Sequence, residues 1–178
     1  MRLETARLVL AEWEPAMAAA LCTLSQDPEN RRFLPDEVFE TPEEAEAAIR
    51  RLLQYRRTGG AQVLAVLQKD GTLVGHAELS PLEEPAGAWE VGYHIGAPCR
   101  GRGYAAEALA AFLPAMLPAL GLREAFGICE ASNIASCSVL ERCGFRLCVQ
   151  KPAVVYGRPA IMRKYRYTLP ETAEKEKA

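Results

Sequence analysis

The sequence predicts an α/β fold (α+β in some schemes), in which helices cover both faces of a mixed, mainly antiparallel sheet. Three observations favour this class. Short runs of apolar and β-branched residues recur along the chain as strand signals. Asp70-Gly71 separates two of these runs and is typical of a tight antiparallel hairpin. Segments with apolar residues at helical spacing are interspersed with the strands, which indicates helices packed on a sheet.

The first sixty residues are predicted to form one strand and two helices. The strand covers residues 7–13, and a helix follows over residues 17–24. Thr41-Pro42-Glu43-Glu44 matches a capping box with proline at the first helical position. A second helix should therefore start there and end near Gly59-Gly60. Residues 27–40 lack a clear period and are predicted to be a loop with one short helical turn.

The other strands are predicted over residues 62–68, 73–79, 89–95, 123–129, 145–150 and 161–169. Gly92 lies inside the third of these strands. A glycine at such a position often marks a bulge or the close approach of another backbone or a ligand.

Two helices lie between the later strands. The first begins at Tyr104, and its apolar pattern runs past Pro114 and Pro118. Each proline removes a backbone donor and clashes with the preceding turn, so we expect a kink or an early end near Leu113. The second helix covers residues 133–143 and is closed by the glycine that follows.

Composition and charge limit the classes of function. A chain of 178 residues suffices for one well-buried domain, predicted over residues 1–170 with residues 171–178 as a disordered tail. A net charge of -2 gives no basic face for nucleic acid, and no segment approaches the roughly 18 apolar residues that span a bilayer. The N-terminus lacks a signal-peptide core. Six cysteines without CxxC pairs favour free thiols in a cytoplasmic protein that binds no metal.

The clearest chemical signal is Arg100-Gly101-Arg102-Gly103-Tyr104-Ala105, between a predicted strand and a predicted helix. Two glycines allow this turn to present successive backbone N–H groups, and the helix start adds unpaired donors and a positive dipole end. Such a turn favours a phosphate or pyrophosphate. It is neither the Gly-x-Gly-x-x-Gly of dinucleotide folds nor a P-loop.

This segment resembles the Q/R-x-x-G-x-G/A signature of the GNAT superfamily of acyl-CoA N-acyltransferases. Two other segments are similar to the same family. Glu90-Val91-Gly92-Tyr93-His94-Ile95 resembles its splayed fourth strand, and Asn133-Ile134-Ala135-Ser136 with Leu140-Glu141-Arg142-Cys143-Gly144-Phe145 resembles its N-x-x-S…L-E-K-x-G-F segment. With the opening Thr5-Ala6-Arg7-Leu8-Val9-Leu10, the chain is most similar to the RimJ/RimL-type branch, from about Leu3 to Leu169.

The resemblance implies a sheet with a splayed pair of strands, acetyl-CoA as cosubstrate and no metal. Backbone N–H groups of the glycine-rich turn would hold the CoA pyrophosphate, and the pantetheine arm would lie between strands that separate after Gly92. A backbone N–H between Tyr93 and Ile95 would polarise the thioester carbonyl. The cofactor-binding residues implied are Tyr93, His94, Ile95, Arg100, Gly101, Arg102, Gly103, Tyr104, Ala105, Asn133 and Ser136.

Amine attack on a thioester benefits from a general base, because alkyl amines are mostly protonated near neutrality. Glu90 on the central strand is the leading candidate. His94 lies on the same strand face unless a bulge at Gly92 breaks the alternation, and Glu78 on the neighbouring strand is the third candidate. The alternative interpretation of Glu90 is a strand carboxylate that pairs with an arginine or faces water.

The general acid departs from the family pattern. Many GNAT enzymes place a tyrosine at the position of Leu140, so Ser136 is the expected substitute that donates to the leaving thiolate. The alternative for Ser136 is a hydroxyl that bonds its own helix backbone. Cys99, Cys137 and Cys143 lack a histidine partner at a readable spacing, which disfavours a covalent acyl-enzyme.

The expected function is acetyl transfer to a primary amine, either a protein N-terminus such as that of a ribosomal protein or a small amine. The protein would be a monomer or homodimer. The acceptor should enter opposite CoA, near residues 27–40 and a loop over residues 150–161. Two other functions are open: a catalytically weak sensor that binds acetyl-CoA, and an unrelated phosphate- or nucleotide-binding protein that uses the same turn.

Overall fold

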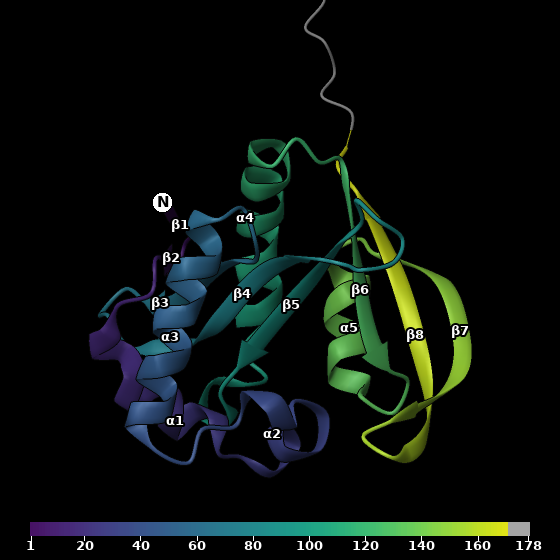
Figure 1. The fold of residues 1–178 in the computed structure, drawn as a ribbon. Helices are drawn as coiled ribbons and strands as arrows, with labels where there is room; N and C mark the ends of the chain where they lie inside the picture. The colour runs from purple at the N-terminus through teal and green to yellow at the C-terminus, as the bar shows by residue number, and fades with distance from the viewer. Residues whose placement is uncertain (171–178) are drawn as a thin grey trace, which may run out of the picture.

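A computed structural model describes residues 1–170, and the predicted tail over residues 171–178 lies outside the described residues. The chain forms an eight-stranded sheet of order β1-β2-β3-β4-β5-β6-β8-β7 (Figure 1). Neighbouring strands pair antiparallel except β5 and β6, which are parallel. This arrangement confirms the predicted mixed, mainly antiparallel sheet. The strands are β1 (Arg2–Glu4), β2 (Leu8–Ala11), β3 (Gln62–Gln68), β4 (Leu73–Pro81), β5 (Trp89–Ile95), β6 (Glu124–Glu130), β7 (Arg146–Val155) and β8 (Arg158–Thr168).

The helices start at the residues that favour helix N-termini. Thr41 Oγ1 accepts a hydrogen bond from the Glu44 N–H (3.3 Å), as the capping box predicts. Asp27 and Asn133 cap two other helices in the same way. The elements are η1 (Pro15–Met17), α1 (Ala18–Ser25), α2 (Pro28–Phe33), η2 (Pro35–Glu37), α3 (Pro42–Arg57), η3 (Ala97–Cys99), α4 (Tyr104–Ala119) and α5 (Ile134–Arg142). None of the helices within residues 1–170 is long and apolar enough to cross a membrane.

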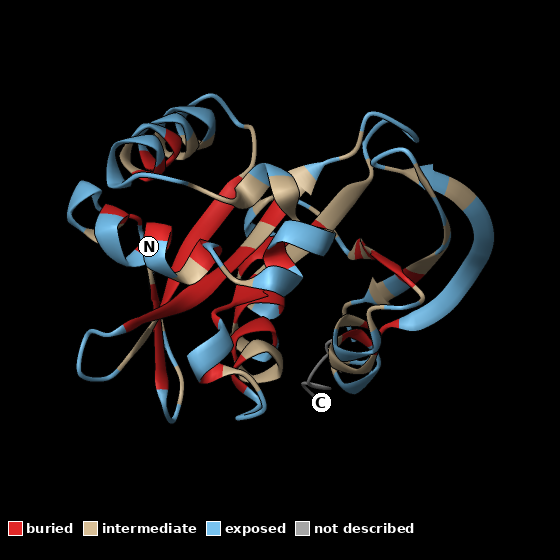
Figure 2. Ribbon diagram, turned by 90° about the horizontal axis from the view of Figure 1, so that it is seen from below, coloured by how far each residue is buried: buried red, intermediate tan, exposed pale blue. Residues whose placement is uncertain are grey.

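Helices cover both faces of the sheet, as predicted. On one face, α1 and α3 pack on β3 and β4 around Trp13, Ile49 and Ala65. On the other face, α4 and α5 bury a larger core that includes Phe112 and Tyr165. Figure 2 shows the buried residues concentrated on the central strands, whereas the edge strand β7 is mostly exposed.

Of the kink or early end expected near Leu113, the early end is wrong, and the kink stays a prediction. Helix α4 continues through both prolines to Ala119. Residues on either side of the prolines, among them Phe112, Met116 and Leu117, are buried in the larger core. We attribute the continuous helix to this packing, which compensates for the missing backbone donors.

The segment over residues 150–161 is not a loop. Strands β7 and β8 extend through it as a long hairpin and meet at Tyr156-Gly157. Both turn residues have positive φ, 48° and 74°, as two-residue hairpin turns often require. Short β1 was missed. The short helical turn predicted within residues 27–40 is present as α2, which is followed by η2.

The bulge considered at Gly92 is absent. β4 and β5 pair in continuous register from Gly75↔Ile95 to Pro81↔Trp89, with Gly92 opposite Glu78. A Cβ on Gly92 would lie 2.9 Å from Glu78 Cγ and 3.2 Å from its Cδ. The glycine therefore makes room for the Glu78 side chain to lie across the strand, whereas the sequence predicted the approach of another backbone or a ligand.

Candidate active site

Strands β5 and β6 part from each other shortly after they meet. They are paired at Glu90↔Phe126. Gly96 N–H donates to Val74 O on β4 (2.9 Å), and hydrogen-bonded pairs alternate along an antiparallel ladder. The backbone groups of His94 therefore belong to the ladder with β4, whereas those of Tyr93 and Ile95 face the gap. The predicted separation of the strands is present and begins just before Gly92.

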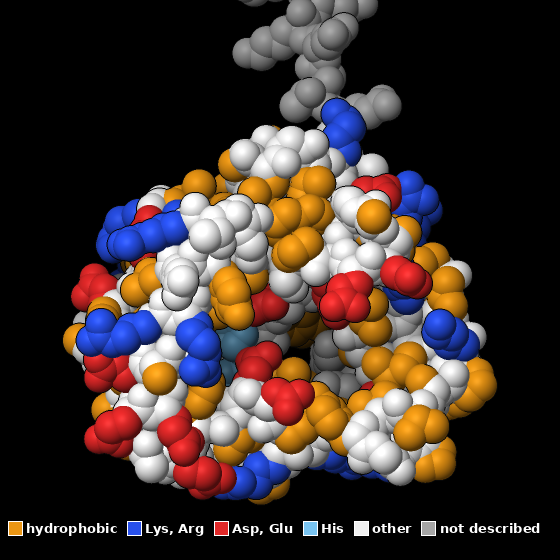
Figure 3. Space-filling model, in the orientation of Figure 1, with side chains coloured by type: hydrophobic (Ala, Val, Ile, Leu, Met, Phe, Trp, Pro, Cys, Tyr) orange, Lys and Arg blue, Asp and Glu red, His pale blue; other side chains and the backbone are white. Residues whose placement is uncertain are grey.

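The gap opens into a cavity of about 660 Å³, a size typical of small-molecule sites. It reaches from the glycine-rich turn, past both split strands, to α2, η2 and the tip of the β7–β8 hairpin. Figure 3 shows a hollow on the face that carries α3, with acidic side chains around it and a histidine beside it. Of the predicted site residues, Arg102 is absent from the lining; the lining contains Glu90, Tyr93, His94, Ile95, Arg100, Gly101, Gly103, Tyr104, Ala105, Asn133 and Ser136.

The glycine-rich turn leaves the start of α4 open to a ligand. Gly103 occupies the N-cap position in the left-handed conformation (φ 79°), and no side chain caps the helix. The first N–H groups of α4 have no partner within the helix. A Cβ at Gly101 would meet no atom within 4 Å. Free N–H groups beside open space can bind a pyrophosphate, so this turn has the geometry of a pyrophosphate site.

Sequence reasoning missed the side chains that hold this turn in place. Arg7 Nη1 donates to Arg102 O (2.9 Å), and its guanidinium lies 4.8 Å from the centre of the Tyr104 ring. Arg7 Nε and Thr5 Oγ1 both donate to Glu107, at 2.6 Å each. Partial burial opposes ionisation of Glu107, but hydrogen bonds from Thr5 and Arg7 outweigh it and leave its pKa lowered. The N-terminal segment thus anchors the first turn of α4.

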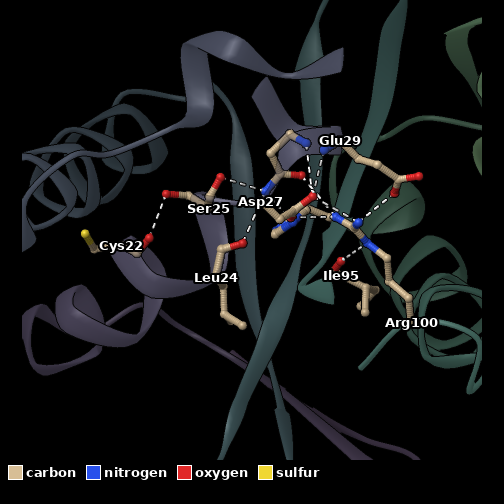
Figure 4. A network of polar contacts seen from close by, with 9 residues as sticks. Cys22, Leu24, Ser25, Asp27, Glu29, Ile95 and Arg100 are labelled. Atoms are coloured by element: carbon tan, nitrogen blue, oxygen red, sulfur yellow. Dashed lines mark hydrogen bonds and ion pairs between the residues drawn. The ribbon is translucent and has the colours of Figure 1, made fainter. Parts of the chain in front are cut away.

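Arg100 ties the end of β5 to α2 (Figure 4). Its Nε donates to Ile95 O (2.8 Å), while its two terminal nitrogens bind Asp27 (2.8 Å) and Glu29 (2.6 Å). Burial raises the pKa of Asp27, but the hydrogen bonds from Arg100 outweigh it and leave that pKa lowered. The Arg100 side chain is therefore already paired. The predicted role of Arg100 in CoA binding therefore rests mainly on its backbone, and it stays a prediction.

Glu90 lies where the two strands part. Burial, and next the negative charge of Glu78, raises the pKa of Glu90 to about 7. The backbone N–H of Ile128 and the charge of Lys164 act in the opposite direction. Glu90 forms no salt bridge with an arginine among the described residues, so the structural alternative of an arginine pair loses its support. A carboxyl group with a pKa near 7 is suited to proton transfer at neutral pH.

His94 shares the strand face of Glu90, as alternation predicts, but its environment differs. Burial, followed by the nearby His76 and Arg100, lowers the pKa of His94 to about 3. Its Nε2 lies 2.9 Å from Asn30 Nδ2, and an amide nitrogen only donates, so this ring nitrogen accepts. A base with so low a pKa removes a proton from an ammonium poorly, which favours Glu90.

Ser136 and Asn133 line the cavity from α5. Asn133 Oδ1 accepts from the Ser136 N–H (3.0 Å), so part of its amide is used as the helix cap. Ser136 Oγ lies 2.9 Å from the hydroxyl of Tyr93. Leu140 is buried, and a Cβ on Gly127 would lie 2.5 Å from its Cδ2, so that Gly127 makes room for the leucine.

Two cysteines near the cavity, Cys129 and Cys143, do not have the environment of a nucleophile. Burial raises the pKa of Cys129 to about 12 and that of Cys143 to about 11. Both thiols therefore stay neutral near pH 7, where only a thiolate reacts as a nucleophile. For Cys143 this agrees with the sequence, which disfavours a covalent acyl-enzyme.

The tip of the β7–β8 hairpin lines the end of the cavity near α2 and η2. Tyr156 donates to Asp36 (3.1 Å), and Arg158 binds Glu130 through both terminal nitrogens and Arg32 O at 3.2 Å. These contacts connect the β7–β8 turn with α2 and η2. The sequence could not predict these contacts, because the partners are more than a hundred residues apart or lie on different elements.

Comparison with known proteins agrees with this geometry. Residues 7–146 match the family described as Acetyltransferase (GNAT) domain. An uncharacterized N-acetyltransferase p20 from Bacillus licheniformis is 25% identical over 145 residues, which are 81% of this chain and 82% of that protein.

Solved structures show the same fold. RimL, a ribosomal L7/L12 alpha-N-protein acetyltransferase solved in complex with coenzyme A, superposes with a TM-score of 0.82 at 19% identity, over 95% of this chain and 98% of that one. The ribosomal-protein-S5-alanine acetyltransferase of Vibrio fischeri gives a TM-score of 0.82 at 17% identity, over 96% and 98%. The chain therefore belongs to the GNAT acetyltransferase domain family and is an acetyl-CoA-dependent N-acetyltransferase.

Proposed function

We propose that this enzyme transfers the acetyl group of acetyl-CoA directly to a primary amine, with Glu90 as general base and Ser136 as donor to the leaving thiolate. The observation that carries the proposal is the position of Glu90. It lines the cavity where β5 and β6 part, and its pKa of about 7 is raised by burial and by Glu78. At that pKa the carboxylate is both populated near neutrality and basic enough to accept the amine proton.

CoA binding is assigned to the face of the sheet that carries α4 and α5. The uncapped N-terminus of α4 would hold the pyrophosphate, and the backbone groups of Tyr93 and Ile95 that face the gap would pair with the pantetheine amides. One of these N–H groups would polarise the thioester carbonyl. Ile95 O is already bound by Arg100, so the N–H of Ile95 and both groups of Tyr93 carry this prediction.

The acceptor is assigned to the opposite face, toward α2, η2 and the hairpin tip. Five glutamates line the cavity. Glu29 and Glu130 pair with arginines, and the other three are Glu37, Glu78 and Glu90. Their negative charge favours an amine that arrives as an ammonium group. We infer a protein N-terminal amine as the acceptor, which is supported by the ribosomal-protein acetyltransferases among the structures of the same fold. A small amine is the second candidate.

Thermal melting with acetyl-CoA, CoA, ATP and NAD side by side tests the cofactor. A ligand at about 100 times its dissociation constant adds about 2.7 kcal/mol to the free energy of unfolding. We expect stabilisation by acetyl-CoA and CoA alone, followed by thiol release with an N-terminal peptide or small amine. Stabilisation without turnover on any amine would instead support a sensor, and equal stabilisation by ATP or NAD would contradict the assignment of the turn.

Gly92→Ala tests the coupling between Glu78 and Glu90. The new Cβ would displace the flexible Glu78 side chain from its place across Gly92. With that charge moved, the pKa of Glu90 should fall below about 7, and the rising limb of kcat/KM against pH should move to lower pH by roughly half a unit to one unit. Glu78→Gln, which removes the charge without a clash, should move the limb in the same direction. An unchanged limb in both variants would show that Glu78 does not act on the base.

A further inference from the structure

The Tyr93 side chain reaches from β5 to α5. Its hydroxyl lies 3.0 Å from Ser136 O and 2.9 Å from Ser136 Oγ. Val91, Tyr93 and Ile95 alternate with Glu90 and His94 along β5, so Tyr93 points to the α5 face while Glu90 points to the acceptor face. Burial raises the pKa of Tyr93, which keeps its phenol protonated.

A phenol carries one proton, so it donates to one of these two oxygens at a time. If it donates to Ser136 O, the Ser136 hydroxyl is left to donate to the phenolic oxygen. If it donates to Ser136 Oγ, the proton of Ser136 is free for another acceptor in the cavity. The change between the two arrangements needs only rotation of two O–H bonds.

We propose that Tyr93 positions the Ser136 hydroxyl for the leaving thiolate, and this inference rests on the proposed role of Ser136. When the amine attacks, the C–N bond forms and the amine proton passes to Glu90. As the C–S bond breaks, its electron pair goes to the sulfur, which accepts a hydrogen bond from Ser136. Tyr93 then donates to Ser136 Oγ, which strengthens that hydroxyl as a donor. The thiolate takes its proton from solvent on release.

The contact with Tyr93 also bears on the alternative interpretation of Ser136, in which its hydroxyl bonds its own helix backbone. A serine in the first turn of a helix often bonds a carbonyl of its own backbone. Here the Ser136 hydroxyl contacts a side chain from another strand, at a lining position of the cavity. Tyr93 therefore acts through Ser136 as a positioning residue, and its hydroxyl supplies a partner where Leu140 replaces the family's tyrosine.

A double-mutant cycle tests the inference. Ser136→Ala should lower kcat by roughly 10- to 100-fold. Tyr93→Phe should lower kcat by roughly 5- to 30-fold, the factor expected from one lost hydrogen bond, with an unchanged KM for acetyl-CoA. The double variant should be no slower than Ser136→Ala, because Tyr93 acts only through that hydroxyl. Melting curves of each variant establish that it is folded.

Tyr165→Phe is the matched control. Tyr165 on β8 is buried, and its hydroxyl donates to Glu141 Oε1 (3.1 Å) on α5, the helix that also carries Ser136. This variant should keep the kcat of the wild type. An equal loss in Tyr165→Phe, or an undiminished effect of Tyr93→Phe in the Ser136→Ala background, would assign Tyr93 a packing role and overturn the inference. A fully active Ser136→Ala enzyme would remove its premise, while turnover by the wild type would leave the proposed function intact.

Discussion

Glu90→Gln is expected to lower kcat/KM for the amine by roughly 10²- to 10³-fold at neutral pH, the range commonly supplied by a general base. Glutamine keeps the shape of the side chain and cannot accept the proton. In the wild type, the active form is the ionised carboxylate. Because the pKa of Glu90 is raised to about 7, kcat/KM should rise as pH increases through about 7 and then level off.

The pH profile separates a catalytic role for Glu90 from a structural one. At high pH more of the amine is already neutral, so the difference between Glu90→Gln and the wild type should shrink as pH increases. The stabilisation by CoA should be unchanged. Glu124→Gln is the control, since Glu124 also lies on one of the split strands but pairs with Arg166 at the surface. If Glu90→Gln has the wild-type rate at every pH, Glu90 is not the general base.

Gly103→Pro should abolish the stabilisation by CoA. Proline fixes φ near −65°, whereas Gly103 has φ 79°. The substitution also removes the Gly103 N–H from the turn and forces the first turn of α4 to reorient. The expected loss is the whole shift in melting temperature produced by acetyl-CoA or CoA. In the wild type that shift corresponds to about 2.7 kcal/mol of added free energy of unfolding at 100 times the dissociation constant.

Gly59→Pro is a matched control for this variant. Gly59 follows α3 with the same φ of 79°, and a Cβ there would meet no atom within 4 Å. Proline is therefore equally incompatible with the backbone at both positions, but Gly59 does not line the cavity. Gly59→Pro should lower the melting temperature and keep the shift produced by CoA. Retained CoA affinity in Gly103→Pro would contradict the assignment of the turn.

Much of the fold could be predicted from local sequence because its signals act over a few residues. The capping box at Thr41, the hairpin at Asp70-Gly71 and the strand at Trp89–Ile95 are present where the sequence places them. The incorrect elements are those that packing decides. Helix α4 continues through two prolines within a buried core, and residues 150–161 extend as a hairpin that reaches α2 and η2.

The same division holds for the site. The glycine-rich turn, the resemblance to the GNAT family and Glu90 as candidate base follow from the sequence, because they depend on residue types at short spacing. Only the tertiary structure decided which candidates have the required environment. Burial and neighbouring charges raise the pKa of Glu90 to about 7 and lower that of His94 to about 3, although both lie on one strand face.

The sequence by itself therefore determined the family, the turn predicted to bind the cosubstrate and the positions of most strands along the chain. The tertiary structure alone placed Glu78 over Gly92, Arg7 against the start of α4 and the Tyr93 hydroxyl on Ser136. The physical reason is the distance along the chain between the residues that interact. Backbone conformation at a turn depends on adjacent residues, whereas a pKa or a hydrogen bond between side chains depends on groups that only folding brings together.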